Sequence, residues 1–361
     1  MKRAAGFAGL FLLAFCIACR YCVPVADFYA VYLYPHISSA LSCIASVLPY
    51  SLEEVVVIAF VVALVSVLVK AIKRKEGFLR WLGSSVVLVM WLYVWFYMGW
   101  GNNYYRTGLY QRNGLERTSY DRDSFNSFLE DYTEELNYSA SAAGEYDRKE
   151  LEAEIKAYYS KQVSSFGYSG LRPWQHVKKP LLNMLYSAVG VHGFMGPFFC
   201  ETQLNLSLLD YEYPFTLAHE MGHLAGVTSE AEANYWGYTF CRSSLNPAVR
   251  YSGCLAILPY VASNAGVLLP EEEFQAWIDS ISDKVKMDYT GSREYWLEKR
   301  VGWIESIQNS FYNLYLKSNG ISEGVKDYSG VVEMIMTMDA SGRSVSVFRP
   351  VPDYQEDSER H

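Results

Sequence analysis

Residues 216–238 read TLAHEMGHLAGVTSEAEANYWGY, and this stretch decides how the rest of the chain is interpreted. His219 and His223 are four positions apart, so on a helix both imidazoles lie on one face and can share a metal ion at ~2.0 to 2.1 Å. Glu220 lies beside them, where its carboxylate can take a proton from a water that the metal activates. The stretch therefore predicts a helix carrying a zinc site, with Glu220 as general base.

A catalytic zinc ion needs a third protein ligand and an open fourth position. Gly226 can end the first helix, and Ser229 can cap a second one, with Glu232 three residues on to complete a capping box. Glu230, at the first position of the second helix, is then free to turn back toward the imidazoles. We predict Glu230 as the third ligand and keep Glu232 as the alternative. Asn234, one turn later on the same face, is predicted to hydrogen-bond to the ligands.

Other interpretations of this pattern were weighed. Isolated histidines in helices are usually packing or surface residues, but the chain has only six histidines and two are here. An intramembrane protease carries the same pattern inside an apolar span, which Glu212, Pro214 and the acidic continuation argue against. The metzincin pattern requires a third histidine at position 229, which is Ser. A zinc site in a water-soluble domain is the interpretation that remains.

The first hundred residues have a different composition. They contain only four acidic and eight basic residues, and three apolar spans near 4–19, 54–69 and 81–100. Each span approaches the ~20 residues needed to cross ~30 Å of hydrocarbon. We therefore predict three transmembrane helices, although a cleaved signal peptide is an alternative for the first span.

The positions of basic residues predict the orientation. Lys2 and Arg3 precede the first span, and five basic residues crowd 70–80, and such loops stay in the cytoplasm. Residues 101–361 are then expected outside the cytoplasm. The link 20–52 is interrupted by prolines and polar residues, so we predict an outer-surface or re-entrant segment beneath the soluble domain.

The remaining residues, 101–349, are expected to form one domain followed by a disordered tail at 350–361. The part outside the first hundred residues has a formal charge of −12, the remainder of the chain's 31 basic and 39 acidic residues. Nucleic acid is therefore an unfavourable partner. The lipid bilayer and a peptide or protein substrate are the expected partners.

Apolar periodicity predicts a mainly α fold with a small sheet. A helical hairpin is expected over 124–163, and the glycine-rich and proline-rich stretch 166–206 should hold the sheet, with a strand from Phe198 to Leu206. That strand is either an edge strand along a substrate cleft or a core strand, and we favour the core strand. Further helices are expected at 214–225, 230–244, 247–264, 271–286, 292–317 (ended by Asn319-Gly320) and 328–337.

Two other features leave alternatives open. A side chain that stabilises the oxyanion of the transition state should approach the site, and four residues are candidates: Arg250, Tyr251, Tyr328 and His192. With 30 tyrosines in the chain, the sequence does not select among them. Cys241 and Cys254 either form a disulfide in an oxidising compartment or are buried free thiols.

The pairing of His219-Glu-Met-Gly-His223 with Glu230-Ala-Glu-Ala-Asn234 resembles the gluzincin pattern of the Ste24/HtpX-type membrane peptidases and the ImmA/IrrE-type peptidases. The resemblance implies zinc held by His219, His223 and Glu230. Asn234 stands where the Ste24/HtpX-type group has Asp, and the gap between the two motifs is shorter than in either group. Both differences leave the substrate class open.

A wider resemblance links the chain to a family of uncharacterised bacterial membrane proteins, a domain of unknown function with zinc-peptidase features. It rests on the zinc segment and on four further stretches: Trp100 to Arg106, Pro197 to Asn205, Arg250 to Gly253, and Tyr315 to Gly320. The resemblance implies three helices in a bacterial cell membrane and a zincin-like α+β metallopeptidase domain. The alternative function is a non-catalytic, zinc-stabilised envelope sensor or assembly protein.

Overall fold

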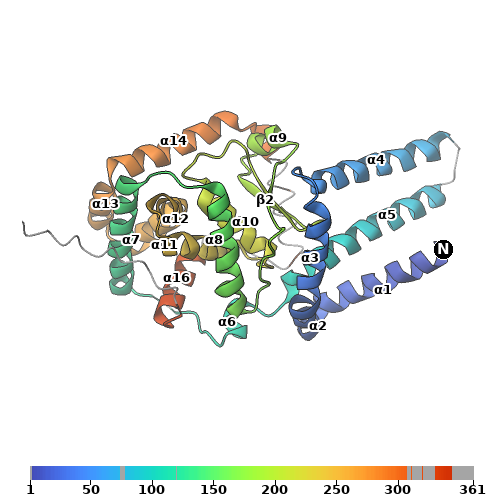
Figure 1. Ribbon diagram of the computed structural model, residues 1–361, viewed down its shortest axis with the longest axis horizontal. Coiled ribbons are helices and arrows are strands. Elements are labelled where there is room, and N and C mark those ends of the chain that lie inside the picture. Colours follow the sequence, from blue (N-terminus) through green and yellow to red (C-terminus); the bar gives the residue numbers. More distant parts are fainter. Residues whose placement is uncertain are drawn as a thin grey trace, which may run out of the picture.

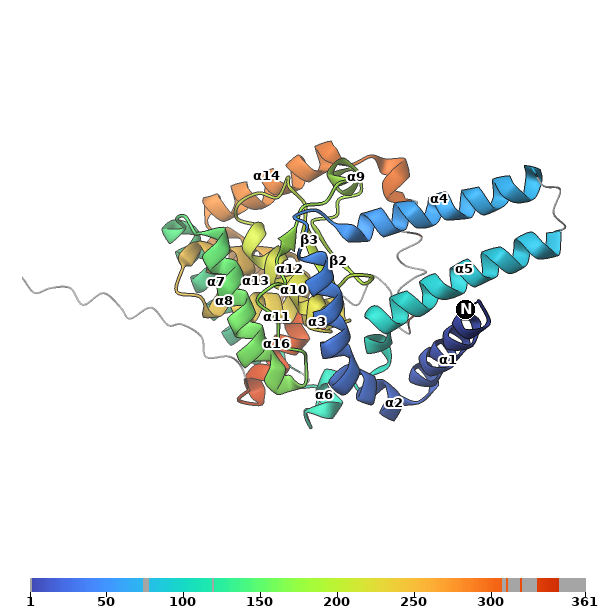
Figure 2. The same ribbon diagram turned by 45° about the vertical axis from the view of Figure 1, so that its right-hand side comes forward.

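A computed structural model of the chain describes residues 2–73, 78–118, 120–306, 310, 319 and 330–343. Three long helices, α1 (Lys2–Tyr21), α4 (Leu52–Lys73) and α5 (Phe78–Gly99), project from one side of a mainly helical body (Figure 1). They run in the same general direction in both views, and α5 packs against both α1 and α4 (Figure 2). The predicted spans 4–19, 54–69 and 81–100 fall on these three helices.

Three helices are long and apolar enough to cross a membrane, or four if a bent pair is one span. Two are α4 and residues 81–99 of α5, and the bent pair joins residues 6–21 of α1 to residues 23–45 through 114°. The third is α12 (Pro247–Leu268), but half of its most apolar window is buried. Because α12 lies inside the body, we assign it to the core (Figure 1).

The link 20–52 is helical rather than irregular. It consists of α2 (Val23–Phe28), the π-helix η1 (Tyr29–Leu33) and α3 (Tyr34–Ala45). Its prolines do not break it, because both lie in first turns, where no intrahelical partner for the missing N–H exists. In both views α3 lies between the body and α4 and α5 (Figures 1 and 2).

The helical hairpin is confirmed as α7 (Arg122–Ala142) and α8 (Arg148–Lys161). Each begins at an aspartate cap. The Asp147 carboxylate, for example, accepts hydrogen bonds from the backbone N–H groups of Lys149 at 2.8 Å and Glu150 at 2.9 Å. The short helices between the hairpin and its neighbours are η2 (Gly101–Tyr105), α6 (Leu109–Arg112) and η3 (Val163–Phe166).

The small sheet lies where it was predicted, with strands β1 (Val177–Lys178), β2 (Gly193–Gly196) and β3 (Glu201–Leu204) in the order β1-β3-β2. β3 runs parallel to β1 and antiparallel to β2. The predicted strand Phe198 to Leu206 is therefore the central strand, and the edge-strand alternative is wrong. It is also shorter than expected, because Cys200 has φ +51°, outside the range of a strand. The edge strand beside α10 (Tyr213–Leu224) is β2.

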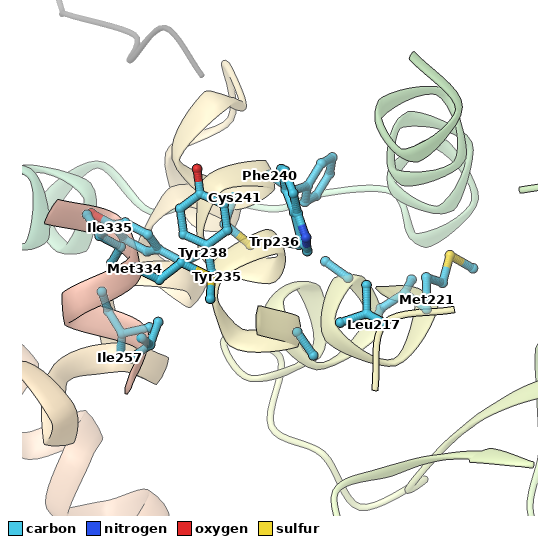
Figure 3. Close-up of a cluster of buried hydrophobic side chains, with 14 of the residues drawn as sticks. Leu217, Met221, Tyr235, Trp236, Tyr238, Phe240, Cys241, Ile257, Met334 and Ile335 are labelled. Atoms are coloured by element: carbon cyan, nitrogen blue, oxygen red, sulfur yellow. The ribbon is translucent and has the colours of Figure 1, made fainter. Parts of the chain in front are cut away.

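Three predicted helices, α10, α11 (Glu230–Ser243) and α12, pack against one another. Figure 3 shows aromatic residues of α11 among apolar side chains of α10, α12 and α16 (Val331–Ala340). Tyr235, Trp236 and Tyr238 are each at most 1% exposed. This core fixes α11 relative to α10, which carries the two histidines of the predicted site.

Two predicted helix boundaries are wrong. The stretches 271–286 and 292–317 were expected as separate helices, but the structure has α13 (Glu271–Ser280) and α14 (Asp283–Lys299). The chain turns at Ile281 and Ser282, which have extended backbones, because the corner buries Ile281 in the core. A further short helix, α9 (Asn183–Ala188), was not expected.

Several expectations lie outside the described residues. They are the end of the predicted helix 292–317, Gly320 of its stop signal, Tyr328 and the tail 350–361.

Candidate metal centre

The first histidine helix, α10, is bounded as the sequence predicted. Gly226 ends it with φ +101°, a conformation that favours glycine. The backbone N–H of Gly226 donates to the His223 carbonyl at 3.0 Å, and that of Val227 donates to the Gly222 carbonyl at 3.1 Å. This paired arrangement is the Schellman motif, which turns the chain sharply at a helix C-terminus. The following helix is thereby brought back toward the imidazoles.

The second helix, α11, begins at the predicted cap. The Ser229 hydroxyl accepts a hydrogen bond from the backbone N–H of Glu232 at 3.3 Å. Glu230 is consequently the first residue of α11, in the short connection from α10. This local geometry aims its carboxylate at the face of α10 that carries His219 and His223.

The three predicted ligands converge. The Nε2 atoms of His219 and His223 are 3.1 Å apart, and Glu230 Oε2 lies 3.2 Å from the first and 3.4 Å from the second. A tetrahedral zinc site with bonds of ~2.0 to 2.1 Å separates its ligand atoms by roughly 3.3 Å. The three atoms therefore fit one face of such a tetrahedron. These three residues are a group that could hold a metal ion.

A hydrogen bond fixes which nitrogen of His223 faces this centre. His223 Nδ1 lies 2.9 Å from the Val227 carbonyl oxygen, which can only accept, so Nδ1 carries the proton. Nε2 is then the nitrogen with a free lone pair, as a metal ligand requires. His219 Nδ1 is buried and has no hydrogen-bond partner among the described residues.

Burial and charge hold the metal-free triad as an ion pair. Burial opposes protonation of His223, but the Glu230 carboxylate outweighs it and raises the pKa of His223 to about 9. Burial also opposes ionisation of Glu230, yet His223 and hydrogen bonds from both imidazoles hold the Glu230 pKa well below its usual range. A proton on His223 thus occupies the place of a cation.

Glu220, the predicted general base, lies against the edge strand. A Cβ atom placed on Gly193 of β2 would be 2.6 Å from Glu220 Cγ, so only glycine fits there. Burial raises the pKa of Glu220 above its usual range. Sequence reasoning missed Gly193, because a single glycine in a glycine-rich stretch gives no signal for a contact 27 residues away.

Glu232, the alternative ligand, points to the other side of α11. Its carboxylate accepts hydrogen bonds from the Tyr168 hydroxyl and from Trp236 Nε1, and lies 3.7 Å from Arg112 Nη2. Arg106 and Arg112 both lie over the Tyr168 ring, at 4.8 and 4.2 Å from its centroid. Glu232 therefore belongs to a structural cluster.

Asn234 is buried, as expected for a residue facing the site, and lies beside the Tyr260 phenol of α12. Tyr260 also lies within electrostatic range of Glu230, and burial raises its pKa. It is half-buried and was not among the predicted oxyanion-stabilising residues. No sequence signal distinguishes it from the other tyrosines.

The described oxyanion candidates are engaged elsewhere. Arg250 is buried and donates to the Glu135 carboxylate at 2.7 Å. Tyr251 donates its hydroxyl to Asp288 at 2.6 Å. His192 stacks on Trp296 with ring centroids 4.3 Å apart.

The two cysteines of α11 and α12, Cys241 and Cys254, are buried free thiols rather than a disulfide.

Elements near the projecting helices hold the end of α10. Trp100, directly after α5, donates its indole N–H to the His223 carbonyl at 2.7 Å, and Tyr34 of α3 donates its hydroxyl to the Leu224 carbonyl at 2.6 Å. On another side, the Tyr159 hydroxyl donates to the Ala218 carbonyl at 2.7 Å. The metal triad is thereby tied to the junction between the body and the projecting helices.

Comparison with known proteins gives a family but no relative of known activity. No curated protein matches the chain, and no solved structure does. One family model, described as a protein of unknown function (DUF3810), matches residues 29–336. The match covers most of the chain, from the π-helix η1 to α16, and includes every residue of the candidate metal centre. The protein therefore belongs to the DUF3810 family of proteins of unknown function.

Proposed function

We propose that this protein is a membrane-anchored zinc metallopeptidase that hydrolyses peptide bonds outside the cytoplasm. The observation that carries the proposal is the convergence of His219, His223 and Glu230, whose ligand atoms all lie within 4.8 Å of one another. Glu220 is adjacent in sequence on the same helix, which adds a carboxylate for proton transfer to the three candidate ligands.

The roles of the side chains follow from this arrangement. A bound zinc ion would polarise the scissile carbonyl and lower the pKa of water toward ~7. The Glu220 carboxylate would take a proton from the attacking water and give it to the leaving amine. Tyr260 is the candidate for donating a hydrogen bond to the developing oxyanion, because it lies beside Asn234 and close to Glu230.

The edge strand supports a peptide as substrate. β2 has β3 on one side only, and an extended peptide can add to such an edge through backbone hydrogen bonds. Gly193 of this strand is the residue that contacts Glu220. A peptide paired with β2 would therefore pass close to the proposed general base.

The extracytoplasmic location rests on the distribution of basic residues. The segment 70–80, which links α4 to α5, contains five of them, and such loops remain in the cytoplasm. The body lies at the opposite ends of α4 and α5 (Figure 2). Its side of the membrane is then the outer one.

The decisive test combines metal analysis with one substitution. Full-length protein purified in detergent should contain about one zinc per chain and cleave members of a peptide library. Glu220→Gln should retain the zinc and lower turnover by roughly 10²- to 10⁴-fold, because it removes only the proton acceptor. The matched control is Glu298→Gln, on the exposed face of α14, which should change neither. Zinc-free wild-type protein of equal stability would reject the proposal.

One observation favours a second function, a non-catalytic and zinc-stabilised envelope sensor or assembly protein. Glu220, His223 and Glu230 are only 6 to 8% exposed, so little of the centre faces solvent. For this function, zinc should bind and raise the thermal stability of the wild type, while no peptide is cleaved. Glu220→Gln would then behave as the wild type in both measurements.

A further inference from the structure

The body carries an exposed apolar surface at α9, next to the projecting helices. We call it the α9 patch, and it comprises Leu181, Leu182, Met184, Leu185 and Trp303. Their side chains are 40 to 87% exposed, with Met184 the highest and Trp303 at 69%. Single exposed apolar residues are ordinary, but a contiguous group marks a surface that contacts something other than water.

The sequence around the patch lacks charge. Residues 180–200 contain no Asp, Glu, Lys or Arg, in a chain of which 19% is charged. The surface of a water-soluble domain normally mixes both signs of charge at such density. A stretch of this composition with its apolar side chains outward is typical of segments that rest in the membrane interface.

Hydrogen bonds connect the patch to the first turn of α4. The backbone N–H groups of Leu181 and Leu182 both donate to the Glu54 carboxylate, the second at 3.1 Å. The segment that bears Trp303 is joined to α9 in turn, because the Val301 N–H donates to the Ala188 carbonyl at 2.8 Å. Both views show α9 close to the base of α4 (Figures 1 and 2).

The length of α4 sets the depth of these residues. Its 22 residues span about 33 Å at ~1.5 Å per residue, close to the ~30 Å of the hydrocarbon core. The charged first turn, with Glu53 and Glu54, therefore lies at the boundary between hydrocarbon and headgroups. Groups hydrogen-bonded to Glu54 lie at the same level, where tryptophan is favoured.

We propose that the α9 patch is immersed in the lipid interface beside α4, so that the body rests on the bilayer as well as being anchored to it. The occupant is lipid because the patch continues the apolar surface of α4, whose Val55 and Ile58 are each 46% exposed. The inference goes beyond the proposed enzymatic function. It depends on α4 crossing the membrane and not on zinc.

The test measures the depth of spin labels in the full-length protein reconstituted into nanodiscs of phosphatidylethanolamine and phosphatidylglycerol. The exposed thiols Cys22 and Cys43 are first replaced by Ala, which leaves only buried cysteines. Single labels are then attached at Met184→Cys and Trp303→Cys. Met287→Cys is the matched control, an exposed methionine nearer the start of α14 than its α9-facing end.

Labels at 184 and 303 should be severalfold more accessible to oxygen, relative to a water-soluble nickel chelate, than the label at 287. Equal ratios at all three positions would overturn the proposal, because the patch would then face water. Shielding of 184 and 303 from both reagents would also overturn it, because a protein surface would then cover the patch. Having two labelled positions keeps the test valid if one variant misfolds.

Discussion

The starts of α4 and α11 both bury two glutamates, but the partners of these glutamates differ. In α4, Glu53 accepts a hydrogen bond from the Phe198 N–H at 2.9 Å, and Glu54 accepts from the N–H groups of Leu181 and Leu182. Each of these carboxylates binds backbone groups of the body. The start of α4 is therefore an anchoring site between a projecting helix and the sheet region.

At the start of α11 the two carboxylates separate. Glu232 binds a tyrosine hydroxyl and an indole N–H, while Glu230 faces two imidazole nitrogens at 3.2 and 3.4 Å. An imidazole nitrogen can hold either a proton or a metal ion, whereas a backbone N–H can only donate. The difference teaches that burial of a glutamate identifies an important position, and only its partners tell an anchor from a ligand.

The largest expected effect separates Glu230 from Glu53. Glu230→Ala removes one of the proposed ligands, and a zinc site worth about 10 to 16 kcal/mol over four ligands should lose about 3 kcal/mol. Zinc affinity should then fall roughly a hundredfold or more in a chelator competition assay. Glu53→Ala should leave zinc affinity unchanged and lower thermal stability. The comparison breaks if Glu53→Ala weakens zinc as much as Glu230→Ala does.

The second prediction concerns pH and belongs to the α11 region alone. Below about pH 9 the metal-free site holds a proton on His223, because its pKa is raised to about 9, and zinc must displace that proton. Zinc affinity should therefore increase by up to about tenfold per pH unit as the pH rises toward 9. Titrations at pH 7, 8 and 9 measure this slope. A flat profile would show that no proton is released.

Two glycines of β2 allow a matched test of both regions. A Cβ atom on Gly196 would lie 2.7 Å from Glu53 Cγ, and one on Gly193 would lie 2.6 Å from Glu220 Cγ. Gly196→Ala should lower the free energy of unfolding by about 1 to 3 kcal/mol through overpacking at the anchor. Gly193→Ala should instead lower turnover with zinc retained, because it displaces the proposed general base. Identical phenotypes for the two variants would contradict this division.

The smallest effect is expected at the cap of α11. Ser229→Ala removes the acceptor for the Glu232 N–H and should cost about 1 kcal/mol of stability. Ser282→Ala is the control, because Ser282 occupies the N-cap of α14 without a side-chain cap bond. Thermal denaturation in detergent should distinguish the two. A loss at Ser282 equal to that at Ser229 would remove the cap as the explanation.

Much of the candidate site could be predicted because its rules are local. Helical spacing places His219 above His223, Gly226 supplies the positive φ that ends α10, and Ser229 starts α11. The same periodicity favoured Glu230 over Glu232, and the structure brings Glu230, not Glu232, to the imidazoles. All of this lies within 14 residues, where backbone geometry relates one side chain to the next.

The amino-acid sequence by itself determined which stretches are helical, where α10 and α11 begin and end, and which three helices project from the body. Only the tertiary structure decided that β3 is central, that Gly193 lies against Glu220, and that the α9 segment is hydrogen-bonded to Glu54. Helix spacing and caps depend on neighbours within about four residues. The other contacts join positions 27 or more residues apart and depend on how the whole core packs.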